Sequence, residues 1–316
     1  MLMYSTFVTG LQEPVAQWTG CVRQVLDGAI LYEGPQKEAM PCFFNSFAVL
    51  EYERQRSSVE QLMLKILRKP PSIKGRRGED FRIVTSRENQ LIAVDKQLRN
   101  NIEKLIAAKT GMIPERRGGG REFWFLTRSE GIALFMERQP SGKERKIKKG
   151  ELRPQLAYCL NRLAQPGADD VMLDPFCGYG AITRARAEYF PCRAIHGLDI
   201  DGQKISALHP RKIYKRADIA ELPSIFPAQS VDVIVTDPPW GLFKESDDIP
   251  QLYRALAKAS LHLLKPGGRT VILSAQKELL RTGIEEGAWG NAGLDACYDI
   301  LVSGQKAAVF VITRKG

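Results

Sequence analysis

Residues 231–241 read VDVIVTDPPWG, an apolar run that ends abruptly in an acid, two prolines and an aromatic residue. A short apolar run bounded by turn residues predicts a buried strand. Pro238 and Pro239 fix the backbone beyond that strand and remove two competing N–H donors. Asp237 and the Pro238 carbonyl can each accept one N–H, and Trp240 offers a flat surface for stacking. The segment therefore suits an exocyclic amine on a planar ring such as a nucleobase, against the simpler alternative of a strand followed by a proline turn.

A second motif lies upstream, where residues 171–180 read VMLDPFCGYG and lead into a helical pattern over 181–188. Glycines at a strand-to-helix turn let a cofactor approach the backbone closely. The next strand, 194–198, ends in Asp199, which follows Gly180 by 19 residues. Doubly wound folds place an acid for ribose hydroxyls at this distance. Asp218 follows the apolar pair Ile213 and Tyr214, and we expect it to hold an adenine amine.

The remaining pattern of the C-terminal half predicts the rest of one sheet. A helix is expected over 251–263, a strand over 270–274, and a terminal hairpin from strands 300–303 and 307–312. Together with the strands above, this gives an α/β fold with a seven-stranded doubly wound sheet. A parallel sheet that ends in an antiparallel hairpin differs from a nicotinamide-binding sheet.

These motifs resemble the Rossmann-fold S-adenosylmethionine-dependent methyltransferases, and most of all the THUMP-domain RNA methyltransferases that form N2-methylguanosine in tRNA. The resemblance lies in DPFCGYG at 174–180, TDPPWG at 236–241 and GELRPQLA at 150–157. Tyr179 departs from the family pattern, which usually has a small residue there, and Trp240 stands where Tyr or Phe is commoner. The resemblance implies a target-base site made of Asp237, Pro238, Pro239 and Trp240. It also implies S-adenosyl-L-methionine as cofactor, held by Asp174, Pro175, Phe176, Gly178, Gly180, Asp199, Ile200, Asp218, Ile219 and Asp237, with no metal ion.

The N-terminal half predicts two small α+β parts ahead of the catalytic domain. Residues 1–70 are interpreted as a ferredoxin-like unit, with strands at 4–9, 29–32 and 43–52 and helices at 13–25 and 59–67. Residues 71–138 resemble a THUMP domain, with strands at 81–85, 121–128 and 132–137 and a helix at 94–109. A basic linker over 139–150 then leads to a methyltransferase domain over 151–316.

Positive charge is concentrated in the middle of the chain, which carries a net charge of +10 overall. Residues 54–150 hold 24 Lys and Arg against 11 Asp and Glu, whereas residues 151–316 hold 20 against 19. A basic surface of this kind predicts contact with phosphates, and the resemblance makes tRNA, or another structured RNA, the expected partner. We expect RNA contacts from Arg116, Arg117, Arg121, Lys143, Arg145, Lys146, Lys148 and Lys149. For the cluster at 116–121 the alternative is a solvated loop. For the cluster at 143–149 it is a soluble connector.

Other classes of protein are disfavoured by composition. The six cysteines form no C-x-x-C pair, which argues against a zinc site or a disulfide framework. No signal peptide is recognised, and no run reaches membrane-spanning length. We expect a cytoplasmic protein that is a monomer or a weak dimer and does not bind membranes.

Three alternative functions share parts of this pattern. A ribosomal-RNA or DNA adenine-N6 methyltransferase shares the tetrad, although a DNA enzyme more often carries a target-recognition insert. A protein-glutamine methyltransferase has no use for the basic block at 54–150 and typically has Asn at position 237. The chain is alternatively an inactive RNA-binding module that keeps the fold, which the intact Asp199, Asp218 and Asp237 argue against.

Overall fold

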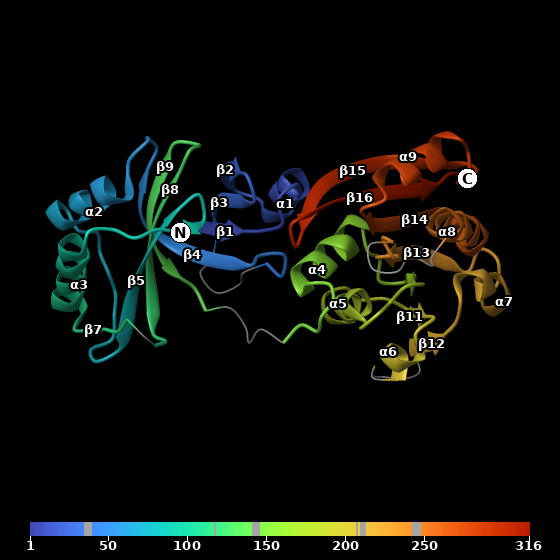
Figure 1. Cartoon of the computed structure of the whole chain (residues 1–316), viewed down its shortest axis with the longest axis horizontal. Helices are drawn as coiled ribbons and strands as arrows, with labels where there is room; N and C mark the ends of the chain where they lie inside the picture. Colours follow the sequence, from blue (N-terminus) through green and yellow to red (C-terminus); the bar gives the residue numbers. More distant parts are fainter. Residues whose placement is uncertain (35–39, 117, 141–145, 207, 209–212, 242–247) are drawn as a thin grey trace. The chain divides into compact units, whose positions relative to one another are not determined.

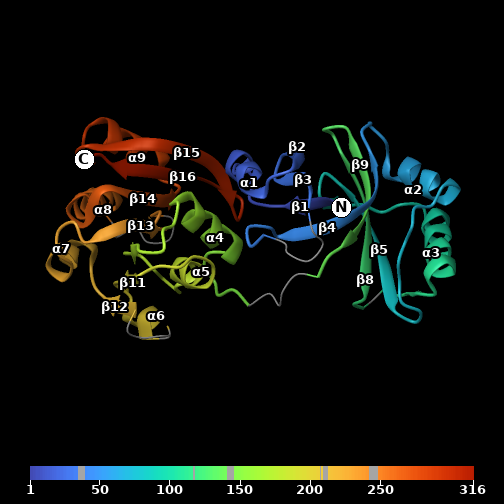
Figure 2. The same cartoon turned by 180° about the vertical axis from the view of Figure 1, so that it is seen from behind.

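The computed structural model describes residues 1–34, 40–116, 118–140, 146–206, 208, 213–241 and 248–316. The chain divides into two compact units (Figures 1 and 2). The first comprises residues 1–7 and 16–144, and the second comprises residues 8–15 and 145–316. Among the described residues, no helix is long and apolar enough to cross a membrane.

The first unit contains one nine-stranded sheet, in the order β2-β3-β1-β4-β9-β8-β5-β6, with β7 paired to β5. Its strands are β1 (Leu2–Thr6), β2 (Val22–Leu26), β3 (Ala29–Glu33), β4 (Asn45–Glu53), β5 (Asp80–Arg87), β6 (Gln90–Leu91), β7 (Ile113–Pro114), β8 (Arg121–Arg128) and β9 (Ile132–Arg138). The helices are α2 (Val59–Arg68) and α3 (Lys96–Thr110), with α1 (Gln12–Thr19) beginning in the other unit's segment 8–15.

The sheet of the first unit crosses the boundary that the sequence predicts at residue 70. Strand β4 pairs with β9 from Phe47 opposite Arg138 to Glu53 opposite Ala133. Helix α2, predicted as part of the first small unit, packs beside α3 on β5, β8 and β9 (Figure 1). The apolar face of α2, with Leu62, Met63 and Ile66 fully buried, finds its partners there because that side of the sheet carries buried Phe residues.

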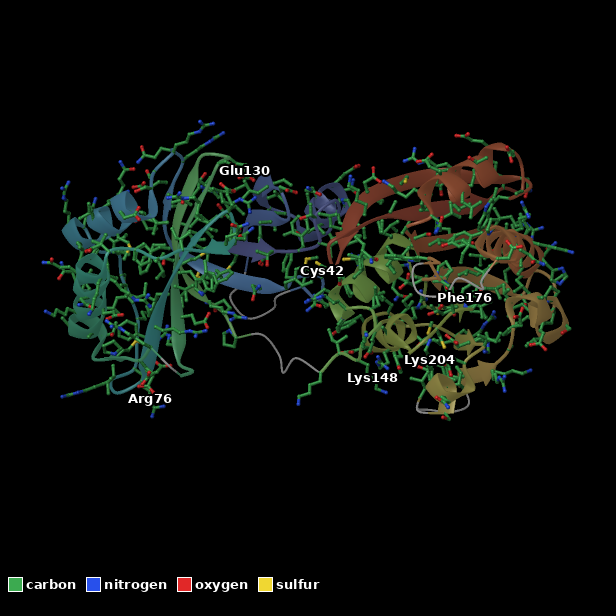
Figure 3. The ribbon with its side chains drawn as sticks, in the orientation of Figure 1. Cys42, Arg76, Glu130, Lys148, Phe176 and Lys204 are labelled. Carbon is green, nitrogen blue, oxygen red and sulfur yellow. The ribbon has the colours of Figure 1, made fainter. Side chains whose placement is uncertain are left out.

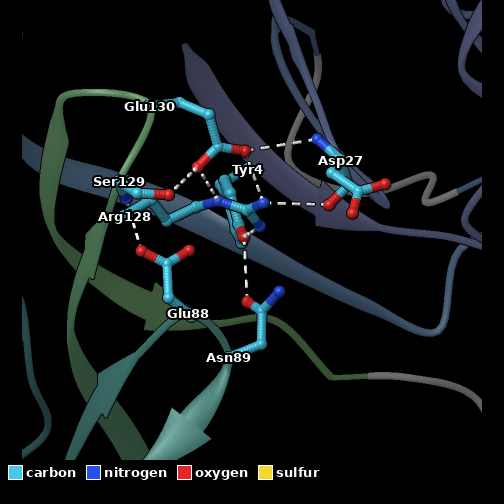
Figure 4. Close-up of polar contacts among 7 residues, drawn as sticks. All are labelled: Tyr4, Asp27, Glu88, Asn89, Arg128, Ser129 and Glu130. Carbon is cyan, nitrogen blue, oxygen red and sulfur yellow. Dashed lines mark hydrogen bonds and ion pairs between the residues drawn. The ribbon is translucent and has the colours of Figure 1, made fainter.

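A polar junction around Arg128 joins the two predicted halves of this sheet (Figure 4). The Arg128 guanidinium donates to the Tyr4 hydroxyl on β1 at 3.2 Å, to the Asp27 carbonyl at 2.9 Å and to Glu130 at 2.6 Å. The Tyr4 hydroxyl in turn donates to Asn89 Oδ1 at 3.1 Å. The hydrogen bond from Arg128 lowers the pKa of Glu130 to about 2. Because Arg128 is only 6% exposed, these bonds are the ones that satisfy its buried charge.

The predicted helix over 13–25 is too long. In the structure α1 ends at Thr19, and Val22–Leu26 is strand β2, paired with β3. Gly20 and Cys21 both have positive φ, at 65° and 42°, and this reversal stops the helix. The apolar periodicity continues through Val22 and Val25, which is why the sequence alone favours one long helix.

The second unit contains the predicted seven-stranded sheet, in the order β12-β11-β10-β13-β14-β16-β15. Its elements, in chain order, are α4 (Pro154–Leu163), β10 (Val171–Asp174), α5 (Ala181–Tyr189), β11 (Ala194–Asp199), α6 (Gly202–Ser206), β12 (Tyr214–Arg216), the 3₁₀ turn η2 (Ile219–Glu221), α7 (Leu222–Ile225), β13 (Val231–Thr236), α8 (Ile249–Leu263), β14 (Leu264–Ser274), α9 (Lys277–Glu285), β15 (Ala292–Val302) and β16 (Gln305–Arg314). The first five strands of this order run parallel, and β16 runs antiparallel to both β14 and β15. The α/β fold and the terminal hairpin predicted from the sequence are therefore confirmed.

Residues 8–15 pack within the second unit, although they lie far from it in sequence. Leu11 and Val15 are fully buried. Gly10 has a φ of 100°, and a Cβ built on it lies 1.8 Å from the Asp299 carbonyl oxygen on β15. The predicted catalytic domain, 151–316, thus lacks a segment that the structure includes in its unit.

Candidate active site

Four acids lie in succession along the carboxyl edge of the parallel sheet. Asp174 ends β10, Asp199 ends β11, Asp218 follows β12, and Asp237 follows β13. Because β10 stands between β11 and β13, Asp174 lies between Asp199 and Asp237 in this row. Parallel strands present their carboxyl ends at one edge, so the order predicted from the sequence becomes one row of acids in space.

The glycine turn after β10 is held from the neighbouring strand. Gly178 N donates to Asp199 Oδ2 at 2.8 Å, and Cys177 N donates to the Leu198 carbonyl at 2.7 Å. Gly178 and Gly180 have φ values of 51° and 72°, which favour glycine. A Cβ on Gly180 meets the Tyr214 hydroxyl at 3.0 Å, whereas a Cβ on Gly178 meets nothing within 4 Å. Gly180 is therefore required for packing, and Gly178 faces open space beside the acids.

Asp174 is buried and only half satisfied. Its Oδ1 accepts hydrogen bonds from Thr236 Oγ1 at 2.9 Å and from Phe176 N at 3.2 Å. Its Oδ2 is buried and has no hydrogen-bond partner among the described residues. Burial raises the pKa of Asp174 to about 8, and the nearby charges of Asp237 and Asp199 act in the same direction. A buried acceptor without a donor marks a place where a cationic or N–H group of a ligand is stabilised.

The other acids and their neighbours offer contacts of different kinds. Asp199 is 8% exposed and accepts backbone N–H groups on both oxygens, the second from Asp201 N at 2.8 Å. Ile200 is 63% exposed beside it, an apolar surface next to a polar one. Asp218 is exposed and caps η2, where its Oδ1 accepts the Ala220 N–H at 2.9 Å. Each carboxylate oxygen keeps a second lone pair, so these bonds leave Asp199 and Asp218 able to accept hydroxyl or amine donors.

Two predicted cofactor residues point into packed regions. Pro175 is buried at the start of the turn, and Ile219 is 8% exposed within the core formed with α7 and α8. Phe176 is half-buried and packs at the edge of the same core. Because the Ile219 side chain is buried in this core, only its backbone is available to contact a ligand.

The tetrad after β13 is a fixed structure. Trp240 Nε1 donates to Asp237 Oδ1 at 3.0 Å, and Gln276 Nε2 donates to the Trp240 carbonyl at 2.6 Å. The Tyr253 hydroxyl shares a 2.5 Å hydrogen bond with Ser274 Oγ and donates to the Pro239 carbonyl at 3.5 Å. Burial raises the pKa of Asp237 to about 7, while the Trp240 hydrogen bond opposes this shift.

Sequence reasoning missed the residues that support this site. Thr236 bonds Asp174, Tyr253 and Gln276 hold the tetrad backbone, and Arg184 holds the turn by donating to the Tyr179 carbonyl at 2.6 Å. Gln276 follows the end of β14 by two residues, a position at the same sheet edge that strand counting alone can identify. Tyr253 lies on α8, and only the fold brings it to Pro239.

The predicted RNA-contact residues have varied surroundings. Arg116 is exposed, but its guanidinium pairs with Glu103 at 2.6 Å and Asn100 at 2.7 Å. Arg121 bonds Glu137 at 2.9 Å through Nε, and Glu79 at 3.5 Å. Lys146, Lys148 and Lys149 are exposed. Arg117, Lys143 and Arg145 lie outside the described residues.

A further basic segment lies just before β5, within the basic block 54–150 but outside the residues predicted to contact RNA. Lys74, Arg76 and Arg77 are all exposed, and Figure 3 labels Arg76. Gly78 N donates to the Gly111 carbonyl at the end of α3 at 2.9 Å. Exposed Lys109 lies in the last turn of that helix. The signal was present as KGRRG at 74–78. Among the described residues, no group of three or more His, Cys, Asp or Glu is arranged to hold a metal ion.

Comparisons with known proteins agree with this geometry. Residues 142–194 and 206–296 match the family described as RMKL-like, methyltransferase domain. The chain is 32% identical over 149 residues to tRNA (guanine(6)-N2)-methyltransferase of Thermus thermophilus, covering 44% of each chain. It is 30% identical over 156 residues to U6 snRNA (guanine-N(2))-methyltransferase THUMPD2 of Bos taurus, covering 46% of this chain and 30% of that one. The matches thus span less than half the length of these relatives.

A solved structure extends the likeness in fold to almost the whole chain. TrmN from Thermus thermophilus superposes with a TM-score of 0.74 at 20% identity, covering 99% of both chains. At this identity the likeness concerns the fold, and it includes the α+β part as well as the Rossmann-like sheet. Residues 142–194 and 206–296, which include Asp174, Asp218 and Asp237 from the row of acids at the sheet edge, therefore form a methyltransferase domain of the RMKL-like type, similar in sequence to the guanine-N2 methyltransferases named above.

Proposed function

We propose that this protein transfers a methyl group from S-adenosyl-L-methionine to N2 of a guanosine in RNA, with tRNA as the substrate. The observation that carries the proposal is the pairing of an open glycine turn with a buried acid and a rigid Asp-Pro-Pro-Trp segment on adjacent strands. The family is one of methyltransferases, and the named relatives act on guanine N2 in tRNA or U6 snRNA.

The residues at the turn fit the proposed cofactor. Asp174 Oδ2 lacks a donor, and the ammonium group of the methionine part is such a donor. Open space at Gly178 accommodates a chain lying against the backbone. Asp199 suits the ribose hydroxyls, exposed Ile200 suits an apolar ring face, and exposed Asp218 suits the adenine amine. Bound there, S-adenosylmethionine supplies an electrophilic methyl group on a sulfonium centre.

The tetrad activates the amine of the target base. The lone pair of a guanine N2 is delocalised into the ring, so an acceptor that bonds its N–H localises it. Asp237 in its ionised form provides that acceptor, and the backbone beside it is held by Tyr253 and Gln276. Catalysis then rests on positioning and on preorganised hydrogen bonds, with the proton leaving after the methyl group has moved. Transfer is direct, and the chain forms no covalent intermediate.

The first unit binds the phosphates of the folded RNA. Its exposed Lys74, Arg76, Arg77 and Lys109 are better placed for phosphates than Arg116 and Arg121, whose charges are paired with internal carboxylates. The target nucleotide turns out of its stack to reach the second unit. We place the protein in the cytoplasm, acting as a monomer or weak dimer and without a metal ion.

Mass spectrometry of nucleosides tests this proposal directly. Transfer RNA is incubated with the protein and S-adenosylmethionine carrying a labelled methyl group, then digested. We expect labelled N2-methylguanosine. Labelled N6-methyladenosine identifies an adenine enzyme instead. Failure of the protein to bind S-adenosylhomocysteine in calorimetry favours the inactive RNA-binding module.

A further inference from the structure

The ring of Tyr179, in the glycine turn, has two lysine ammonium groups close to it. The ammonium of Lys148 lies 4.6 Å from the ring centroid, and that of Lys204 on α6 lies 5.9 Å from it. Figure 3 labels both lysines, which lie on the same side of the second unit. Such distances are typical of cation–π contacts.

Lys148 is fixed in place by hydrogen bonds to the catalytic unit. Lys148 N donates to Glu151 Oε2 at 3.0 Å, and Glu151 N donates back to the Lys148 carbonyl at 3.0 Å. The Glu151 side chain is 1% exposed and pairs with Arg184, which also donates to the Tyr179 carbonyl. One chain of contacts therefore fixes Lys148 to the turn whose ring it covers.

The charge at this ring is positive. Two ammonium groups lie within 6 Å of the centroid of one ring, where they repel each other. Among the ion pairs of the described residues, Lys204 faces Asp201 at 3.8 Å, and that pair is partly exposed to solvent. Lys148 itself is exposed. An anion bound beside the ring offsets this repulsion, so the cluster is suited to a phosphate.

The cluster and the proposed target-base site lie at the same edge of the sheet. Tyr179 follows β10 and the tetrad follows β13, and these strands are neighbours with parallel register. A nucleotide whose base reaches Asp237 brings its flanking phosphates to this edge of the sheet.

We propose that Lys148, Tyr179 and Lys204 form an RNA-phosphate clamp at the mouth of the cofactor site, which grips the backbone next to the target nucleotide. The ring orients the lysines, and the lysines bind the phosphate. The proposal rests on RNA being the substrate, as proposed above, and adds a contact within the catalytic unit to those of the first unit.

The test measures tRNA affinity across about 50 to 200 mM salt for Lys148→Ala, Lys204→Ala, Tyr179→Phe and Tyr179→Leu. Removal of one phosphate contact makes the slope of log affinity against log salt shallower by about 0.7 to 0.9. We expect this for each lysine variant and several-fold weaker binding for Tyr179→Leu, with Tyr179→Phe unchanged because it keeps the ring. Lys258→Ala, an exposed lysine on α8, is the matched control and keeps the parent slope.

Calorimetry with S-adenosylhomocysteine separates RNA binding from cofactor binding. We expect both lysine variants to bind it with parent affinity, which also shows that they are folded. Weaker S-adenosylhomocysteine binding with an unchanged tRNA slope assigns the lysines to the cofactor carboxylate and overturns the clamp. Unchanged tRNA affinity and slope overturn it too. If tRNA binding depends on the two lysines but the protein transfers no methyl group, the clamp is supported and the proposed reaction is not.

Discussion

The indole nitrogen of Trp240 donates a hydrogen bond to Asp237 Oδ1 across 3.0 Å. The residue assigned to stacking thus also controls the charge of the acid assigned to the amine. Burial raises the pKa of Asp237 to about 7, and the indole hydrogen bond holds it lower than burial alone does. Only the ionised carboxylate serves fully as an acceptor, so the pH of the medium controls the proposed reaction.

We therefore expect turnover to rise as the pH increases through about 7 and to level off above it. Trp240→Phe removes the donor, which lets the pKa of Asp237 rise, so its midpoint moves to higher pH. Both effects are measured as kcat against pH at saturating tRNA and cofactor. Superimposable profiles for the two proteins would show that Asp237 does not titrate in the reaction.

Asp237→Ala removes the acceptor itself. We expect kcat to fall by about two to three orders of magnitude, as for loss of one preorganised polar group, with little change in tRNA or cofactor affinity. Trp240→Ala is the companion variant and loses about 1 to 3 kcal/mol of base stacking. If both variants only lower the melting temperature while turnover per folded molecule stays constant, the tetrad is a structural turn.

Cofactor binding is expected to release a proton from Asp174. Its pKa of about 8 means that the buried carboxyl is mostly protonated at pH 7. An ammonium group placed beside Oδ2 favours the ionised form, so affinity for S-adenosylhomocysteine rises with pH between about 6 and 7.5. Calorimetry in two buffers with different ionisation enthalpies measures the released proton. Asp174→Asn, which cannot titrate, shows no release.

The raised pKa of Asp174 also affects the stability of the folded protein. The pKa of Asp174 in the folded protein lies above its ordinary value of 3.8, so the folded state holds the proton more tightly. The stability this contributes is fully present below about pH 4 and is lost as the pH rises through about 8. Between these limits we expect the melting temperature of Asp174→Asn to change less with pH than that of the parent. If the melting temperatures of the parent and of Asp174→Asn change with pH in parallel across this range, the raised pKa does not belong to Asp174.

Gly178→Ala and Gly180→Ala test which glycine leaves space for the cofactor and which is needed for packing. Both residues have positive φ, so both variants bear a similar backbone cost of about 1 kcal/mol. The Cβ at 178 enters open space, whereas the Cβ at 180 meets Tyr214 at 3.0 Å. We expect Gly178→Ala to lose S-adenosylhomocysteine affinity with a small change in melting temperature, and Gly180→Ala to show the larger thermal loss. The reverse order would place the cofactor elsewhere.

Gly10→Ala tests whether residues 8–15 stabilise the catalytic unit. The added Cβ lies 1.8 Å from the Asp299 carbonyl oxygen, so the segment must shift away from β15. Gly20→Ala is the control, since that glycine also has positive φ but meets nothing within 4 Å. Differential scanning calorimetry should show a lower transition temperature for Gly10→Ala. Equal transitions for both variants would mean that the segment adds no stability.

Much of the catalytic half was predictable because its signals are local. A glycine turn after a strand, acids at strand ends and a proline tetrad each carry their meaning within a few residues, and the fold confirms their order along one edge. Even the hairpin turn at Ser303 and Gly304, both with positive φ, was indicated by the glycine. The longer extent of β15 was not, because Ala292–Val302 alternates weakly and is mostly half-buried, with one fully buried residue.

The first unit was predicted less well because its organisation depends on distant partners. Apolar periodicity shows that α2 has one buried face but not which sheet covers it, and the pairing of β4 with β9 joins residues about 90 positions apart. The paired charges of Arg116 and Arg121 were equally hidden. Their carboxylate partners, Glu103 and Glu137, come from other elements, and sequence alone counts such arginines as free cations.

The position of residues 8–15 has a consequence for synthesis of the protein. This segment leaves the ribosome well before its partner around Asp299, which lies more than 280 residues further along the chain. Until then its apolar residues Leu11 and Val15 lack the surroundings that bury them in the finished protein. This unit is therefore completed only when the β15–β16 hairpin has been translated. A chain truncated before β15 exposes the apolar residues of this segment, which makes it a target for chaperones and proteases.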